Sequence, residues 1–306
     1  MDLELSTEQE LLDDSLRALF ADHAGRERAR AMHGTVDRAL IDRLGANGFL
    51  DVAEAGPIEA ILVAERAAEA VAAAPIGARV LVGPLAGVKD LPPVVGLVGS
   101  PDGLVRYAGH CDAYLVLTGD SAAVAGADDV EVEPVASRAP WPTGRVRVQW
   151  SESLGEGSGD ALRRAWQVGL AAEIGSMALA ATEFASRHVA ERHQFGRPIG
   201  SFQSVQHRLG RSYAMAQATR WLGRRGAWHH TDEYRTAAAA TFACLTARET
   251  YDNTHQVVGA IGLTTEYGMT EWTMRLLALH TELGGLRPHA RRVAACRTAH
   301  IERSHQ

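Results

Sequence analysis

The residues best suited to chemistry lie in the segment Arg192-His-Gln-Phe-Gly-Arg-Pro-Ile-Gly-Ser-Phe-Gln203. The planar guanidinium of Arg192 can donate two parallel hydrogen bonds to a diphosphate, and the amide of Gln203 adds a further donor. Proline lacks the N–H that a helix needs, so Gly196-Arg-Pro-Ile-Gly200 predicts a tight loop beside which both side chains are displayed. The alternative is an ordinary connection that carries a solvated arginine.

A second segment, Gln256-Val-Val-Gly-Ala-Ile-Gly262, combines an amide with closely spaced glycines. Glycine lets a backbone approach a nucleotide that a Cβ atom would keep away. Taken alone, the same segment fits the end of a helix followed by a turn equally well.

A candidate acid–base group is Glu282, in His280-Thr-Glu-Leu-Gly-Gly285. A carboxylate can remove a proton from a carbon next to a carbonyl, if hydrogen bonds to the carbonyl oxygen stabilise the enolate that develops. Many glutamates at helix ends are simply solvated, and that alternative stays open.

Other kinds of site are not indicated. His207, His229, His230 and His255 lack the spacing of metal ligands, and no nucleophile elbow, P-loop or dinucleotide fingerprint occurs. The three cysteines show no paired or metal-like spacing, which predicts reduced thiols. We therefore expect no metal.

The elements that must position these residues fall into three predicted domains. Residues 1–88 predict an α-helical domain, with Ser6 and Gln9 in capping-box spacing. Residues 89–150 predict a small β domain whose strands, near 94–98, 113–117, 130–135 and 145–150, we expect to be antiparallel. Residues 151–306 predict a four-helix bundle, in which helices of about 161–190 and 204–231 flank the Arg192 loop.

The Arg192 loop between two long helices closely resembles that of the acyl-CoA dehydrogenase family, flavoenzymes that desaturate acyl-CoA thioesters. The resemblance implies an N-terminal helical domain, a β middle domain and a C-terminal four-helix bundle. It also implies that Arg192 and Gln203 reach the pyrophosphate of FAD. The turn that includes Gln256, Val257, Gly259 and Ala260 would touch the adenosine half, with Ala260 in place of an expected glycine.

The same resemblance identifies Glu282 with the catalytic base of the family. Some members carry their base on the earlier long helix, but the corresponding residues here, Trp166 and Gln167, are not acids. The β domain is short and lacks the Thr-Glu-Pro and Gly-Ser-Asp loops that full-length members place against the flavin. Thr118-Gly-Asp120 is better explained as a hairpin turn.

The resemblance therefore predicts that FAD is shared across a subunit interface, either with a longer homologous dehydrogenase subunit or in a self-dimer. The chain is similar to the shortened subunits of heteromeric bacterial members, which act on bulky steroid- or isoprenoid-derived thioesters. The substrate would be an acyl group on CoA or on a carrier protein. The alternative is a flavin-free protein, either a scaffold subunit or a non-redox acid–base enzyme such as a dehydratase or cyclase.

Bulk composition narrows the remaining possibilities. The 306 residues carry a net charge of −6, which gives no electrostatic reason to expect nucleic acid or a membrane surface as partner. The polar N-terminus predicts no secretory signal, and no uninterrupted apolar run reaches the roughly 20 residues of a membrane span. We expect a cytoplasmic oligomer.

Overall fold

The computed structural model describes residues 4–100 and 103–304. Its N-terminal part is helical, as the sequence predicts, and contains α1 (Thr7–His23), α2 (Arg26–Ala31), α3 (Arg38–Ala46), η1 (Val52–Glu54), α4 (Pro57–Glu69), η2 (Ala78–Val82) and α5 (Gly83–Leu85). The expected capping box is present: the Ser6 hydroxyl accepts from the Gln9 backbone, and the Gln9 side chain accepts from Ser6. The helix α4 ends at Glu69, and Val71, two residues later, has a φ of 48°.

Two small sheets follow, formed by β1 (Val95–Val98), β2 (Leu104–Arg106), β3 (Ala113–Thr118), β4 (Ser121–Gly126), β5 (Val130–Pro134), β6 (Thr143–Val148) and β7 (Glu152–Ser153), with η3 (Ala127–Asp129) before β5. One sheet has the order β1-β3-β4-β7 and the other β2-β6-β5. The four expected strands are present. The expectation of purely antiparallel pairing is wrong, because β1 and β3 are parallel.

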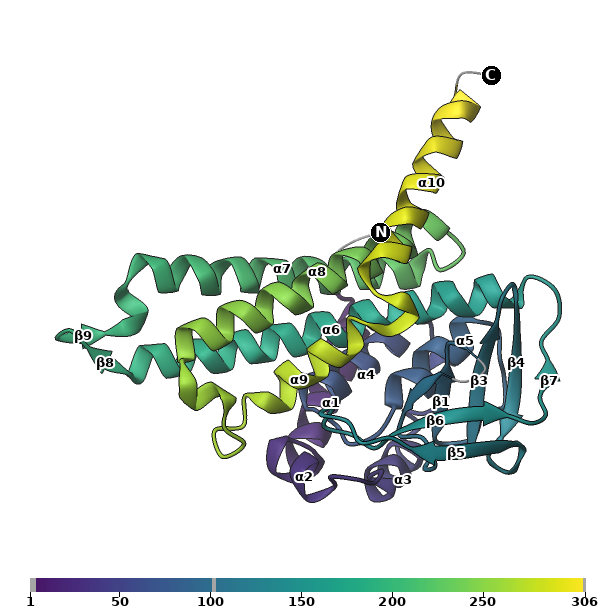
Figure 1. The fold of residues 1–306 in the computed structure, drawn as a ribbon, viewed down its shortest axis with the longest axis horizontal. Helices are drawn as coiled ribbons and strands as arrows, with labels where there is room; N and C mark the ends of the chain where they lie inside the picture. Colours follow the sequence, from purple (N-terminus) through teal and green to yellow (C-terminus); the bar gives the residue numbers. More distant parts are fainter. Residues whose placement is uncertain (1–3, 101–102, 305–306) are drawn as a thin grey trace.

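The C-terminal part contains α6 (Ser158–Glu191), β8 (His193–Gln194), β9 (Arg197–Pro198), η4 (Ile199–Ser201), α7 (Gln203–Trp228), α8 (Glu233–Val258), η5 (Ala260–Leu263), α9 (Thr270–Leu279), η6 (Glu282–Gly284) and α10 (Leu286–Ser304). The helices α6, α7 and α8 run side by side, and the shorter α9 packs against α6 and α8 (Figure 1). After its first turns, α10 leaves the body of the molecule.

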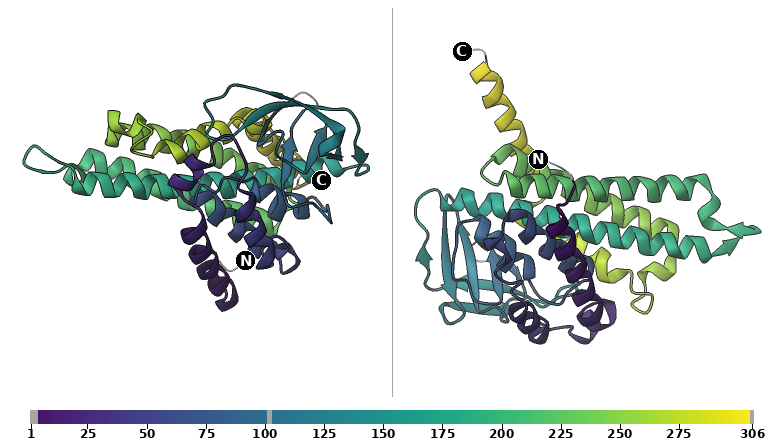
Figure 2. Two further views of the ribbon diagram at one scale, coloured as in Figure 1. Left: turned by 90° about the horizontal axis from the view of Figure 1, so that it is seen from below. Right: turned by 180° about the vertical axis from the view of Figure 1, so that it is seen from behind.

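The sheets and the N-terminal helices cover only one half of α6. The other half of the bundle extends beyond them toward β8 and β9 (Figures 1 and 2). By length and composition α6 could cross a membrane, but 89% of its most apolar 18-residue window is buried inside the protein. One hydrophobic core is continuous from α1 through the sheets to α6, so the three stretches share a single interior.

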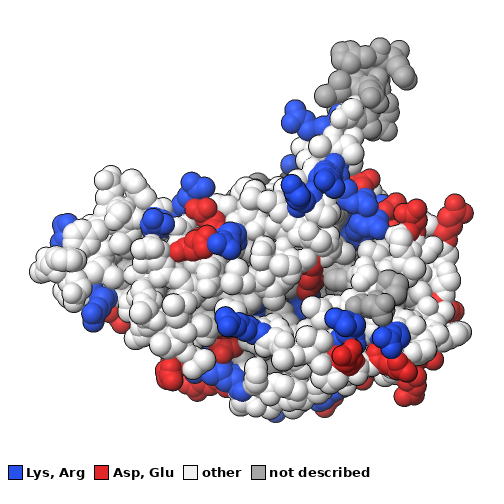
Figure 3. Space-filling view, viewed as in Figure 1, with Lys and Arg blue, Asp and Glu red and all other residues white. Residues whose placement is uncertain are grey.

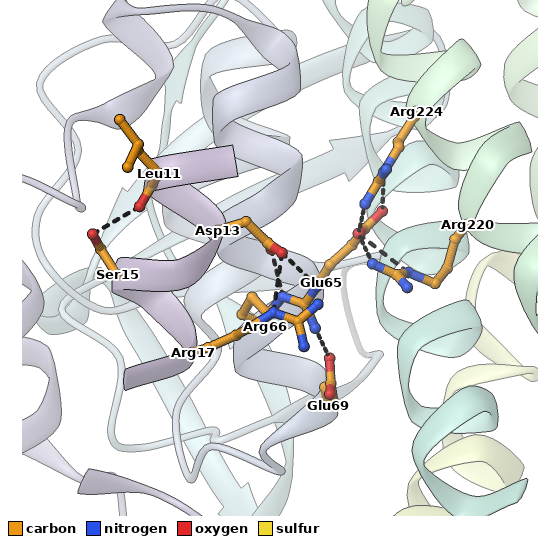
Figure 4. Close-up of polar contacts among 9 residues, drawn as sticks. All are labelled: Leu11, Asp13, Ser15, Arg17, Glu65, Arg66, Glu69, Arg220 and Arg224. Carbon is orange, nitrogen blue, oxygen red and sulfur yellow. Dashed lines mark hydrogen bonds and ion pairs between the residues drawn. The ribbon is translucent and has the colours of Figure 1, made fainter. Parts of the chain in front are cut away.

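Buried ion pairs fasten the N-terminal helices to the bundle (Figure 4). Glu65 on α4 is completely buried and accepts hydrogen bonds from both Arg220 and Arg224 on α7. On the opposite side of α4, Arg66 pairs with Asp13 of α1 and with Glu69. The two contacts together fix the position of α4 between α1 and α7.

Candidate functional site

The three polar side chains predicted to grip a nucleotide come together at one end of the bundle. Arg192 follows α6, Gln203 begins α7, and Gln256 lies in the last turn of α8. A small apolar cluster that includes Val189, Leu209 and Val257 holds these three helix ends together. We call this the distal end, because it lies away from the sheets (Figure 1).

All three side chains at the distal end are exposed. Within residues 4–100 and 103–304, Arg192 has no ion-pair partner, so its guanidinium keeps its full capacity to donate hydrogen bonds. The hairpin of β8 and β9 projects beside it, with Phe195 at its turn 90% exposed and at a φ of 55°. A surface of this kind is suited to contact another molecule rather than to stabilise the chain.

The glycine turn after α8 contains two glycines with different roles. Gly259 has a φ of 77°, and no atom lies within 4 Å of the position that a Cβ would take, so its backbone is open to a ligand. At Gly262 a Cβ would lie 2.6 Å from the methyl group of Met269, which gives that glycine an internal packing reason. Ala260 is exposed, whereas the Val257 side chain packs into the bundle and can offer a ligand only its backbone.

The donors of the distal end fit the pyrophosphate and adenosine half of a dinucleotide. An unpaired guanidinium, two exposed amides and an open glycine backbone are the groups that such a ligand requires. A dinucleotide there would need a second protein surface to enclose its other half.

Glu282, the predicted base, lies far from these residues. It is in η6, after α9, and its partner Trp166 is in the first part of α6. At 1.5 Å per residue, the 26 residues from Trp166 to Arg192 span about 39 Å along the helix. The sequence-predicted residues thus form two separate groups, one at the distal end and one beside the sheets.

Both carboxylate oxygens of Glu282 are already engaged. Oε2 accepts a hydrogen bond of 2.7 Å from the indole nitrogen of Trp166, and Oε1 lies 2.8 Å from Nε of Arg106. Arg106 also pairs with Glu173 on α6 at 2.8 Å. The side chains of Arg106 and Glu282 are 15% and 16% exposed, so this cluster is largely shielded from water.

The electrostatics of the cluster reflect its burial. Burial raises the pKa of Glu282, Arg106 opposes that change, and the neighbouring carboxylate of Glu173 adds to it. Burial would lower the pKa of Arg106, but Glu173 and Glu282 outweigh it and raise the pKa. Two carboxylates therefore share one guanidinium.

A hollow of about 680 Å³ opens beside Glu282, between the sheets and the start of α6. The buried Gln167 and His289 contribute to its wall and are joined by a hydrogen bond of 3.1 Å between Nε2 and Nδ1. Burial lowers the pKa of His289 to about 4, so this imidazole is neutral near pH 7.

Two features of the wall of this hollow are packed against α6 or belong to it. The Trp166 ring lies 3.4 Å from the position that a Cβ on Gly99 would take, and it also engages Glu282. Residues 119–120 form the two-residue turn between β3 and β4, as the sequence predicts, and the Gly119 carbonyl accepts from Arg163 on α6. This turn is therefore packed against α6.

Other chemistry is not indicated. Among the residues that the structure describes, no group of three or more His, Cys, Asp or Glu side chains is placed to hold a metal ion. Cys111 and Cys244 are buried, and burial raises their pKa values to about 12 and about 11. Sequence reasoning missed Arg106; the signal that could have found it is its partner Glu173, an acidic residue within an apolar stretch of α6.

Comparison with known proteins agrees with this architecture. A chain from the ChsE4-ChsE5 complex of Mycobacterium tuberculosis superimposes with a TM-score of 0.83 at 19% identity, covering 96% of this chain and 98% of that one. The Tcur3481-Tcur3483 steroid ACAD (acyl-CoA dehydrogenase) matches equally well, at 20% identity and a TM-score of 0.83, covering 96% and 99%. The fold is that of the acyl-CoA dehydrogenases.

The sequence itself gives the same result. Residues 167–296 match the family "Acyl-CoA dehydrogenase, C-terminal domain". Acyl-CoA dehydrogenase FadE34 of Mycobacterium tuberculosis is 29% identical over 215 residues, which are 68% of this chain and 29% of that protein. The chain thus spans less than a third of that relative. The predicted resemblance is confirmed to this extent: residues 167–296 match the C-terminal domain of the acyl-CoA dehydrogenases, and the chain has the acyl-CoA dehydrogenase fold.

Proposed function

We propose that this chain is one subunit of an FAD-dependent acyl-CoA dehydrogenase, and that its distal end completes a flavin site on another subunit. The observation that carries the proposal is the exposure of Arg192, Gln203 and Gln256 together at one end of the bundle. They lie about 39 Å along α6 from the chain's own hollow, so they cannot serve it.

In this proposal each residue at the distal end has a defined part. Arg192 binds the pyrophosphate bidentately, Gln203 adds a hydrogen bond to it, and Gln256 with the backbone at Gly259 and Ala260 contacts the adenosine half. FAD, when bound, accepts a hydride from the β-carbon of the thioester as its α-proton is removed. This chain's contribution is to hold the dinucleotide and exclude water from its adenosine end.

The partner is best explained as a longer homologous subunit with complete middle-domain loops, and a self-dimer is the simpler alternative. Large aromatic side chains on the outer face of α7 support subunit contact: Tyr213, Trp221 and Trp228 are 46%, 48% and 53% exposed. Exposed tryptophan and tyrosine are enriched at protein interfaces. We place this assembly in the cytoplasm.

The proposed substrate class is a bulky acyl thioester, such as a steroid-derived one. One structural neighbour is titled a steroid ACAD, and a site built from two unlike chains can be wider than one within a single chain. The reaction introduces an α,β double bond into the acyl group.

The test is co-expression with a homologous full-length subunit, followed by flavin absorbance and bleaching by acyl-CoA. We expect Arg192→Ala to weaken FAD binding by about 10- to 100-fold, the loss of a charge-assisted bidentate contact. Arg197→Ala, in the same hairpin, is the matched control, because Arg197 stacks on Phe202 within the chain. Equal FAD affinity in wild type and Arg192→Ala would contradict the proposal.

A flavin-free scaffold subunit is the second candidate, and the engagement of both Glu282 oxygens favours it. It predicts a complex whose FAD content and affinity are independent of every residue at the distal end. A colourless protein with acid–base activity on acyl thioesters would instead support the dehydratase or cyclase alternative.

A further inference from the structure

We propose that Glu282, which the sequence resemblance identifies with the base of the family, acts here as a structural clamp that joins the sheets to the helical bundle. Four side chains from three separate parts of the chain meet at this clamp: Arg106 from β2, Trp166 and Glu173 from α6, and Glu282 from the turn after α9. Arg106 is the central member, since it contacts both carboxylates.

Each carboxylate oxygen of Glu282 is held by a contact within the protein. Oε1 is held by Arg106 at 2.8 Å and Oε2 by the Trp166 indole at 2.7 Å. A general base must be within hydrogen-bond distance of the proton that it removes. Any movement of Glu282 toward a substrate would break one of these contacts, and breaking a shielded ion pair is costly because it leaves a charge uncompensated.

The backbone next to Glu282 makes an unusual turn that needs supporting contacts. Leu283, Gly284 and Gly285 have φ values of 52°, 84° and 74°, a left-handed run that is unfavourable for the leucine. The chain therefore turns sharply here, and the adjacent α10 begins at Leu286. Such a turn persists only where surrounding contacts fix it, and the pairing with Arg106 and Trp166 supplies them.

The clamp also explains how the small sheets of this chain stay packed against the helical bundle. The strand β2 has only three residues, and its Arg106 side chain crosses to α6 and to η6. A pair of carboxylates from two elements around one guanidinium fixes all three elements relative to one another. The contacts beside the hollow thus hold the sheets against α6.

A double-mutant cycle on this chain alone tests the clamp without any flavin. We expect Arg106→Gln and Glu282→Gln each to raise the unfolding equilibrium constant by about 10- to 100-fold, the range for hydrogen bonds to charged groups. The double variant should unfold less readily than the two effects combined predict, because the contact between Arg106 and Glu282 can be lost only once. Glu156→Gln, in the exposed loop before α6, is the control. Additive single effects would overturn the clamp.

An activity measurement on the complex with the homologous subunit gives the second arm, and only this arm rests on the proposed function. Glu282→Gln should leave the rate of acyl-CoA-dependent bleaching within about twofold, and Trp166→Phe, which keeps the ring but removes the donor, should do the same. A loss of bleaching of about 100-fold or more in Glu282→Gln, with its stability unchanged, would restore Glu282 as the base. Failure of the proposed function would appear separately, as FAD affinity that is insensitive to Arg192→Ala.

Discussion

The most informative perturbation of the fold is Glu65→Gln, which removes one negative charge from the interior while keeping the side-chain volume. Glu65 is 0% exposed, and its two oxygens accept from Arg220 at 2.6 Å and from Arg224 at 2.7 and 3.0 Å. In the variant the amide group would place its own donors against guanidinium donors. Both arginines would then be left shielded without a counter-charge.

Breaking a buried ion pair by removing one partner costs about 3–5 kcal/mol. For a chain of this size, a loss of that order lowers the melting temperature by about 5–8 °C. The assay is thermal unfolding followed by circular dichroism, with Glu10→Gln on the exposed face of α1 as control, for which we expect little change.

The pH dependence supplies an independent check. Burial alone would raise the pKa of Glu65, but Arg220 and Arg224 outweigh it and lower the pKa below the ordinary value of 4.5. A depressed pKa stabilises the fold fully above the unfolded-state value, and this contribution is lost as the pH falls through the folded-state value. The gap between wild type and Glu65→Gln should therefore be full at pH 7 and shrink below about pH 4.5. A melting temperature within 1–2 °C of wild type at pH 7 would refute the reasoning, since it corresponds to less than about 1 kcal/mol.

Two further predictions concern packing and thiol reactivity. Gly175→Ala should destabilise the fold by about 1–3 kcal/mol, because its Cβ would lie 2.9 Å from Cγ and 3.0 Å from the backbone nitrogen of Arg220. Gly210→Ala, whose Cβ would meet nothing within 4 Å, should stabilise α7 by about 0.5–1 kcal/mol. Urea unfolding distinguishes the two variants, and equal effects would contradict the account. Cys111 and Cys244 should resist iodoacetamide at pH 8 until the protein unfolds, since burial raises their pKa values to about 12 and about 11; mass spectrometry that finds either one labelled in the native protein would contradict their burial.

Much of the fold follows from local signals in the sequence. The capping box at Ser6 starts α1, and the Gly196–Gly200 insert ends α6 before α7 begins, because these residues act through their immediate neighbours. The strands β2 and β4 were missed. β2 has three residues, and β4 (Ser121–Gly126) consists mainly of small residues with weak strand preference.

The pairing of elements is less accessible from sequence. The parallel arrangement of β1 and β3 depends on how the intervening chain crosses over, which no local pattern encodes. The projection of α10 away from the bundle likewise depends on the sharp turn at Leu283, where a leucine adopts a positive φ. Sequence pattern alone indicated four helices side by side.

The candidate site divides in the same way. The distal-end residues were predicted from the resemblance of two short segments to the family, and the structure brings them to one end of the bundle, while their role stays a prediction. The environment of Glu282 could not be predicted, because Arg106 is far away in sequence and reaches it only through the tertiary fold. The expectation of a base at Glu282 considered its place at a helix end, whereas its chemistry depends on which side chains fold around it.

Charged residues of both signs lie on the face shown in Figure 3. On the face shown in Figure 3, basic and acidic residues alternate over most of the surface, with basic residues gathered where α10 leaves the body. Arg287, Arg291 and Arg292 all lie on that first part of α10. This face therefore offers no extended basic surface of the kind that binds nucleic acid.

Photoaffinity labelling with an azido-adenine derivative of FAD tests the central claim most directly. The complex with the homologous subunit is labelled, digested and examined by mass spectrometry. The account predicts that labelled peptides of this chain contain the distal-end segments around Arg192–Gln203 or Gln256–Ala260. Labelling confined to peptides around Trp166 or Glu282, with the distal end unmodified, would contradict it.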